Sequence, residues 1–148
     1  MNAKNKSFAL PLTFIGIMFF AIGFALGINS LLVPVLQGSL GISNAASYLI
    51  IAATFIPFLV FGYPAGLTIK AIGYKRTMSL SFIIFAVAFY LFILSADYKS
   101  FSLFLLASFI SGAANAYLQA SVNPYITILG PLESAAKRIS IMGICNKL

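Results

Sequence analysis

The chain has 148 residues, of which 61% are hydrophobic and only 7% are charged, and it contains no histidine and no tryptophan. A soluble domain carries roughly a quarter charged residues, so this composition excludes a water-covered globular domain and indicates an integral membrane protein. The formal net charge of +7 does not indicate a nucleic-acid partner, because the basic residues are dispersed in short segments between apolar runs.

Four apolar segments are each long enough to cross a bilayer, which takes about 20 mostly apolar residues. They cover residues 8–36, 46–69, 78–94 and 101–129, and a fifth begins near residue 139. The first segment follows two lysines, as a signal peptide does, but its apolar run is too long for one, so we expect a retained span. We predict an all-α membrane protein without a separate soluble domain. Because the chain stops inside the fifth segment, we expect an N-terminal part of a longer protein.

The basic residues predict the orientation of these spans. Seven of the nine lie before the first segment (Lys4, Lys6), after the second (Lys70, Lys75, Arg76) or after the fourth (Lys137, Arg138). Positive residues mark the cytoplasmic side, so we expect a multi-pass protein of the cytoplasmic (inner) membrane with its N-terminus inside. Lys137 and Arg138 are then expected at the level of the lipid headgroups. Lys147, further along the fifth helix, is expected either to face a cavity or to extend back to the inner surface.

Polar residues form a stripe along the fourth segment. At about 100° per residue, its members fall within roughly 120° of one another on a helical wheel; they are Ser108, Ser111, Gly112, Asn115, Gln119 and Asn123. One interpretation is hydrogen bonding between helices. The other, which we favour, is the wall of a cavity for a polar, uncharged solute, because amides both donate and accept. Pro124 removes one backbone hydrogen bond and should loosen the helix beside Asn123.

The first segment has a matching face of small residues, made of Thr13, Gly16, Gly23, Gly27 and Ser30. Gly23 and Gly27 form a GxxxG pattern, which allows two helices to approach closely. The pattern is a weak signal by itself. We predict that this face serves mainly for helix packing.

Three stretches of the sequence resemble the fucose and glucose/galactose permease family of the major facilitator superfamily. These stretches are "NSLLVP" (residues 29–34), "YPAGLTIKAIGYKR" (63–76) and "LQASVNPYITILGPLESAAKRIS" (118–140). The last is the most distinctive, and the resemblance covers essentially the whole chain. It implies the first four and a fraction helices of a twelve-helix transporter, which moves sugars by alternating access between two six-helix halves.

The resemblance also implies roles for particular positions. Proton-coupled members carry acids where this chain has Ser30 and Gln119, and an amide that contacts sugar in such members matches Asn146. A nearby glutamine position of the family is Gly143 here. The loop after the second segment resembles the gating motif of the superfamily, with Lys70 in place of its usual acid; the matching residues are Gly66, Lys70, Gly73, Lys75 and Arg76.

We therefore predict a secondary transporter for a neutral monosaccharide such as fucose, glucose or galactose. Its predicted substrate-binding residues are Gln119, Asn123, Asn115, Asn146 and Ser30. Because Ser30 and Gln119 do not titrate, proton symport through them is not expected; sodium coupling is preferred, with facilitated diffusion and coupling beyond Leu148 left open. The alternatives are efflux of apolar drugs, a four-span structural or assembly protein, and a truncated product without function.

An enzyme is not predicted. The sequence shows no nucleophile, base and acid set, and its two acidic residues, Asp97 and Glu133, fall between the spans. Cys145 is the single cysteine, so an intrachain disulfide is excluded and no cysteine or histidine cluster indicates a metal. We predict no metal and no cofactor, and the lipid bilayer as the surrounding partner.

Overall fold

The computed structural model describes residues 9–41, 43–129 and 132–147. Within these ranges only the backbone is described for residues 9, 25, 26, 28–30, 32, 33, 36, 37, 39, 40, 44, 132, 146 and 147. The described residues form five α-helices and one 3₁₀ turn: α1 (Ala9–Leu40), α2 (Asn44–Ile72), α3 (Tyr74–Asp97), α4 (Phe101–Ile128), η1 (Leu132–Ser134) and α5 (Ala135–Lys147). The predicted all-α fold is confirmed.

The helices extend beyond the apolar segments predicted from the sequence. An apolar run measures the part of a helix that suits hydrocarbon, whereas the helix itself continues until a cap ends it. Ser43 caps the start of α2 by accepting a hydrogen bond from the Ala46 amide at 3.3 Å. Ser100 caps α4 in the same way. The fifth helix begins at Ala135, about one turn before the predicted residue 139.

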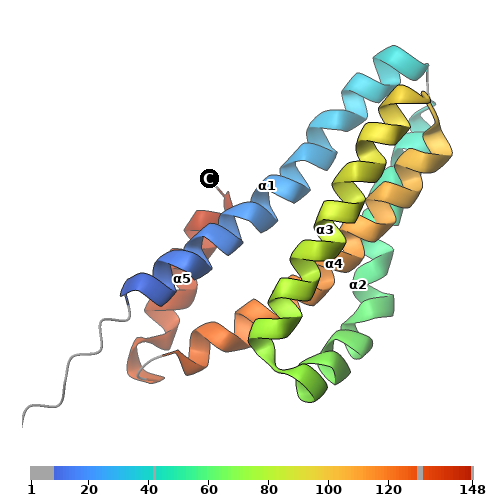
Figure 1. Cartoon of the computed structure of the whole chain (residues 1–148). Coiled ribbons are helices and arrows are strands. Elements are labelled where there is room, and N and C mark those ends of the chain that lie inside the picture. Colours follow the sequence, from blue (N-terminus) through green and yellow to red (C-terminus); the bar gives the residue numbers. More distant parts are fainter. Residues whose placement is uncertain (1–8, 42, 130–131, 148) are drawn as a thin grey trace, which may run out of the picture.

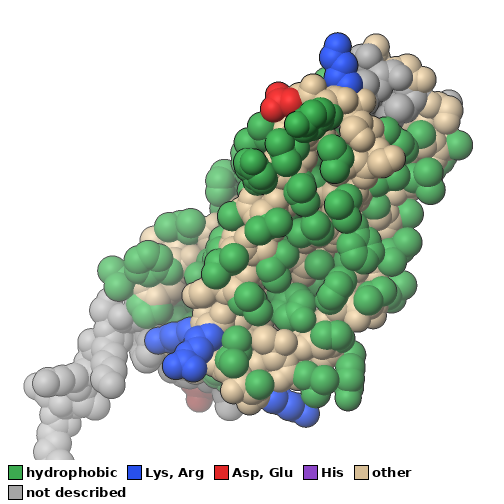
Figure 2. Space-filling model, turned by 45° about the vertical axis from the view of Figure 1, so that its right-hand side comes forward, with side chains coloured by type: hydrophobic (Ala, Val, Ile, Leu, Met, Phe, Trp, Pro, Cys, Tyr) green, Lys and Arg blue, Asp and Glu red, His purple; other side chains and the backbone are tan. Residues whose placement is uncertain are grey.

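The surface of the protein suits a membrane. Over the described residues, α2, α3 and α4 are each long and apolar enough to cross a bilayer, and α1 contributes the shorter apolar stretch Leu10–Phe24. Large hydrophobic side chains are exposed along the helices, Leu59 at 87% for example. Figure 2 shows charged side chains at the two ends of the molecule and a mostly hydrophobic surface between them. Such a surface would be unfavourable in water and is favourable in lipid.

Helix α4 lies at the centre of the bundle. It packs most extensively against α3 and α2, and it also contacts α1 and α5 (Figure 1). Small residues along α4 allow this close packing. A Cβ atom placed on Gly112 would lie 2.2 Å from the carbonyl oxygen of Thr54 on α2 and 3.0 Å from a ring carbon of Pro57. Glycine is therefore required where α4 crosses α2.

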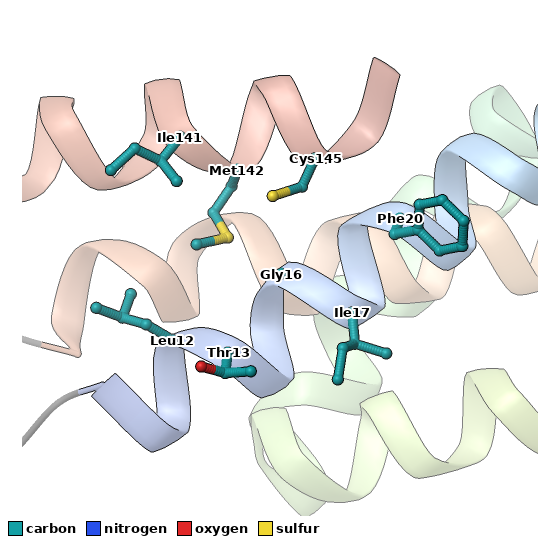
Figure 3. A pocket seen from close by; sticks show the side chains of 8 residues that line it. All are labelled: Leu12, Thr13, Gly16, Ile17, Phe20, Ile141, Met142 and Cys145. Carbon is teal, nitrogen blue, oxygen red and sulfur yellow. The ribbon is translucent and has the colours of Figure 1, made fainter. Parts of the chain in front are cut away.

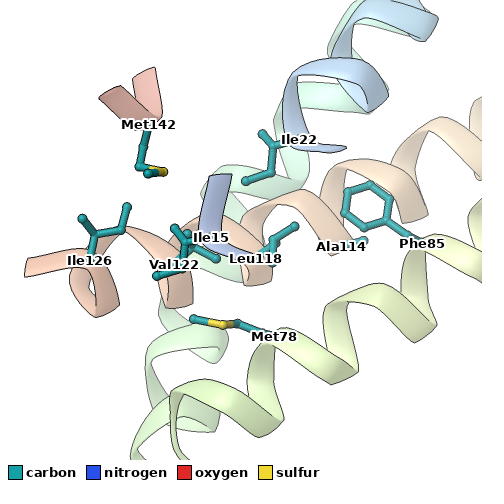
Figure 4. Close-up of a cluster of buried hydrophobic side chains, with 9 residues drawn as sticks. All are labelled: Ile15, Ile22, Met78, Phe85, Ala114, Leu118, Val122, Ile126 and Met142. Carbon is teal, nitrogen blue, oxygen red and sulfur yellow. The ribbon is translucent and has the colours of Figure 1, made fainter. Parts of the chain in front are cut away.

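A hydrophobic cluster joins four helices of the fold. Its buried members come from α1, α3, α4 and α5 (Figure 4), and they are Ile15, Ile22, Met78, Phe85, Ala114, Leu118, Val122, Ile126 and Met142. Met142 is the contribution of α5, and it is only 5% exposed. The side of α4 that carries Leu118 and Val122 thus faces α1, and the short α5 is attached to the same core.

One glycine makes the connection between α2 and α3. Gly73 has φ = +83°, a region that favours glycine. Its amide donates to the Ile69 carbonyl at 2.9 Å, which closes α2. Its carbonyl accepts from the Thr77 hydroxyl at 2.8 Å, which starts α3. The predicted second loop is therefore mostly helical.

Candidate solute-binding site

Two amides of α4 are joined by a side-chain hydrogen bond within the bundle. Asn115 is 1% exposed, and Gln119 lies one turn later and is half-buried. Gln119 donates from Nε2 to Asn115 Oδ1 at 3.1 Å. This bond holds the Gln119 side chain against the helix, while its Oε1 and second Nε2 hydrogen take no part in it. An oriented amide of this kind can bind a hydroxyl group as donor and acceptor.

The predicted polar stripe changes character along α4. Ser108, Ser111 and Gly112 are buried, and Gly112 packs against the α2 backbone. Gln119 is half-buried and Asn123 is exposed. The N-terminal half of the stripe therefore serves helix packing, and the C-terminal half has surface that a solute could reach.

Ser108, in the packed N-terminal half of the stripe, has an unpaired hydroxyl among the described residues. Its hydroxyl oxygen is buried and has no hydrogen-bond partner among the described residues. Ser121, another buried serine of α4, donates instead to the Tyr117 carbonyl at 2.6 Å. A serine without a partner in a packed interface gives no support to interhelical hydrogen bonding as the role of the stripe.

Three predictions fall on side chains outside the described part. The structure describes only the backbone of Ser30, Asn146 and Lys147. Their backbones lie within α1 and α5. The structure therefore brings together Asn115 and Gln119, with Asn123 one turn further along, and the roles of Ser30 and Asn146 remain predictions.

The residues of the predicted gating loop lie in consecutive order at one end of the bundle. Gly66 and Lys70 belong to α2, Gly73 links the helices, and Lys75 and Arg76 open α3. The three basic side chains are exposed. Lys75 also lines a hollow of about 370 Å³, which is otherwise bordered mostly by apolar residues of α1 and α3 with Tyr125 of α4. The structure shows this arrangement, and a gating role stays a proposal.

A second hollow, the groove between α1 and α5, has a volume of about 440 Å³ (Figure 3). Its lining residues are Leu12, Thr13, Gly16, Ile17, Phe20, Ile141, Met142 and Cys145. A Cβ on Gly16 would lie 3.8 Å from Cys145 Sγ and 3.9 Å from Met142 Sδ, which are ordinary contacts. The small face predicted on α1 thus meets α5 at Thr13 and Gly16, whereas a Cβ on Gly27 would meet no atom within 4 Å. Neither hollow is lined by Gln119 or Asn123.

The side chain of Arg138, a residue predicted at the headgroup level, is bound within the protein, and its depth in the membrane stays a prediction. The side chain is 7% exposed and reaches back to the end of α4. Its Nε donates to the Ile126 carbonyl at 3.3 Å and its Nη2 to the Thr127 carbonyl at 3.4 Å. Its Nη1 donates to the Ser134 hydroxyl. The last carbonyls of a helix have no partner within the helix, and they attract a cation, so they hold the Arg138 side chain within the protein.

The comparison with known proteins decides the family. Residues 13–148 match the Major Facilitator Superfamily. The chain belongs to this superfamily. It is 34% identical over 147 residues to a glucose/galactose transporter of Brucella abortus, which covers 99% of this chain and 36% of the relative. It is 28% identical over 143 residues to the L-fucose-proton symporter of Escherichia coli, which covers 97% of this chain and 33% of the relative.

A solved structure agrees with this membership. The crystal structure of the E. coli fucose:proton symporter matches with a TM-score of 0.80 and 26% sequence identity, over 95% of this chain and 33% of that chain. The predicted resemblance is confirmed, and the fold is that of the N-terminal part of a major-facilitator bundle. The chain spans about a third of the length of these relatives. The relatives are transporters, in agreement with a protein that is not an enzyme.

Proposed function

We propose that the chain is the N-terminal part of a secondary transporter, which carries a neutral monosaccharide across the membrane by alternating access. The observation that carries this proposal is the oriented pair of Asn115 and Gln119 on the central helix of a major-facilitator fold. The relatives named as glucose/galactose and fucose transporters support a sugar as the solute. They give no support to a structural or assembly protein.

The amides of α4 would bind sugar by hydrogen bonding alone. Gln119 and Asn123 would contact sugar hydroxyls, which donate and accept as amides do. Asn115, almost fully buried, would act through Gln119 by holding its amide in one orientation. In a site of low dielectric such bonds are stronger than in water, and an analogue that leaves them unmade is rejected. Apolar drugs would leave these amides without partners, which argues against drug efflux.

The coupling ion is a separate part of the proposal. Two relatives are named L-fucose-proton symporters, which speaks against the preference for sodium stated above. Gln119 is an amide and cannot carry a proton at any physiological pH. If the whole transporter is coupled to protons, the proton therefore binds at another residue.

The distribution of charge supports a multi-pass protein of the cytoplasmic membrane with its N-terminus inside. Lys70, Lys75 and Arg76 lie at one end of the bundle, where α2 passes into α3. Asp97 and Lys99 lie at the opposite end of α3, before α4 begins. By the positive-inside rule the first end is cytoplasmic, and α4 then runs from outside to inside.

The test is a sugar-binding measurement on the protein expressed from its natural gene, including any codons that follow Leu148. Binding of labelled galactose, glucose and fucose to purified protein in detergent is measured together with competition by unlabelled sugars. We expect saturable binding of at least one of them that a charged sugar acid does not compete. Absence of binding by all three, in protein that is folded and monodisperse, would exclude the proposed substrate class.

A further inference from the structure

The connection between α4 and α5 contains a buried cation that the proposed function does not use. Arg138 of α5 bonds the carbonyls of Ile126 and Thr127, which are 12 and 11 residues earlier in the chain. It also donates to the Ser134 hydroxyl in the turn that precedes α5. One side chain thus connects the last turn of α4, the 3₁₀ turn and the first turn of α5.

The end of α4 needs such a partner. The Ile126 and Thr127 carbonyls belong to the last turn of α4, where intrahelical donors are missing. Pro124, just before them, lacks an N–H, so the carbonyl four residues before the proline also lacks its helical donor. A guanidinium is suited to the task because its planar fork presents several donors at fixed angles, whereas a lysine ammonium is a single point charge.

The contact made by Arg138 continues along one face of α5. Met142 and Cys145 follow at spacings of four and seven, so the three side chains share a side of the helix. Met142 belongs to the core cluster and Cys145 lies beside Gly16 of α1 (Figure 3). The attachment of α5 to α4 at Arg138 therefore sets how closely the rest of this face approaches α1.

We propose that Arg138 is a positioning residue, which fixes α5 to the C-terminal turn of α4 and thereby keeps the groove between α1 and α5 in its observed width. Its consequence for sugar transport rests on the proposed function, because α5 carries the predicted Asn146. The attachment itself does not, since it concerns the distance between two helices. A measurement of groove accessibility can therefore succeed or fail independently of any sugar.

Cys145 provides the readout for this test. It is the single cysteine of the chain, it is half-buried, and it lines the groove. The rate of its alkylation by a maleimide is measured in membranes containing the full-length protein, in which any cysteine beyond Leu148 has been replaced by serine. Cys145→Ser gives the background. Lys137→Gln is the matched control, because it removes the same charge from an exposed neighbour on the same turn.

We expect Arg138→Gln to raise the alkylation rate about tenfold, since a hydrogen bond to a charged group shifts a local equilibrium by about that factor. Arg138→Lys, which keeps the charge but not the fork, should fall between Gln and wild type. Ser134→Ala, which removes one partner, should give a smaller increase and serves as the test if Arg138→Gln does not reach the membrane. The proposal would be overturned if alkylation rates stay within twofold of wild type for Ser134→Ala, for Arg138→Lys and for any Arg138→Gln protein that inserts. In that case Lys137→Gln would be equally unchanged.

Discussion

Asn115 and Gln119 lie one turn apart on α4, and a hydrogen bond of 3.1 Å joins Gln119 Nε2 to Asn115 Oδ1. The two residues differ in burial, since Asn115 is 1% exposed and Gln119 is half-buried. This pairing gives them different expected roles. We propose that Gln119 contacts the solute and that Asn115 orients the Gln119 amide.

Replacement of Gln119 by alanine should weaken sugar binding without preventing insertion. The loss of one or two hydrogen bonds to uncharged hydroxyls corresponds to an increase in Kd of about five- to thirtyfold. The measurement is equilibrium binding of labelled sugar to the full-length protein. Ser102→Ala, at an exposed position near the start of α4, is the control and should bind as wild type does. An unchanged Kd for Gln119→Ala would remove Gln119 from the site.

Replacement of Gln119 by glutamate should make sugar binding depend on pH. A glutamate has an ordinary pKa of about 4.3, so the new carboxyl is largely ionised at neutral pH and gains a proton as the pH falls. Only the protonated form keeps a donor toward a sugar hydroxyl, so affinity should rise on acidification relative to wild type at the same pH. Parallel pH profiles for wild type and Gln119→Glu would show that this position does not face the solute.

Replacement of Gly112 by alanine should destabilise the bundle. The added Cβ would lie 2.2 Å from the Thr54 carbonyl oxygen, which is backbone and cannot move aside alone. Overpacking of this kind costs about 1–3 kcal/mol, and the thermal unfolding temperature in detergent should fall. Gly62→Ala is the control, because its Cβ would meet no atom within 4 Å and alanine is the better helix former. An unfolding temperature for Gly112→Ala equal to that of Gly62→Ala would contradict the close crossing of α2 and α4.

Replacement of Gly73 by alanine should also destabilise the protein, for a different reason. The backbone of Gly73 has φ = +83° and ψ = 167°, a conformation that costs an alanine about 1–3 kcal/mol. Space is not the obstacle, since a Cβ there would meet no atom within 4 Å. Gly66→Ala, in open space without a positive φ, should leave the unfolding temperature nearly unchanged. A stable Gly73→Ala would mean that the turn between α2 and α3 has an alternative geometry.

The sequence predicted the membrane fold because its apolar runs are long, and a bilayer leaves few alternatives to helices of that length. It also placed Asn115 and Gln119 on one side of a helix, since this depends only on helical periodicity. It could not predict what covers that side. Ser108 and Gly112 share the stripe but are buried, whereas Asn123 is exposed. A helical wheel gives the direction of a residue and says nothing of the neighbouring helix.

Arg138 shows the same limit in another way. A basic residue at the start of a helix after a loop is usually at the membrane surface, and the sequence predicted this level without indicating what the side chain would bind. The carbonyls that bind its side chain are 11 and 12 residues earlier in the chain. The chain turns back between α4 and α5, and the local sequence does not show in which direction it turns. One signal was present, however. The last carbonyls of any helix lack intrahelical donors, and an arginine nearby in sequence can bind them.

The most direct test of the account is sugar uptake by proteoliposomes that contain the protein expressed from its natural gene, with any codons that follow Leu148. We predict uptake of a labelled neutral monosaccharide above that of empty liposomes, reduced in Gln119→Ala and unaffected in Ser102→Ala. The 148-residue chain reconstituted alone should give no uptake, because it spans about a third of its transporter relatives. Failure of the inserted, folded protein to take up glucose, galactose or fucose, or full uptake by Gln119→Ala, would contradict a neutral-sugar site on α4.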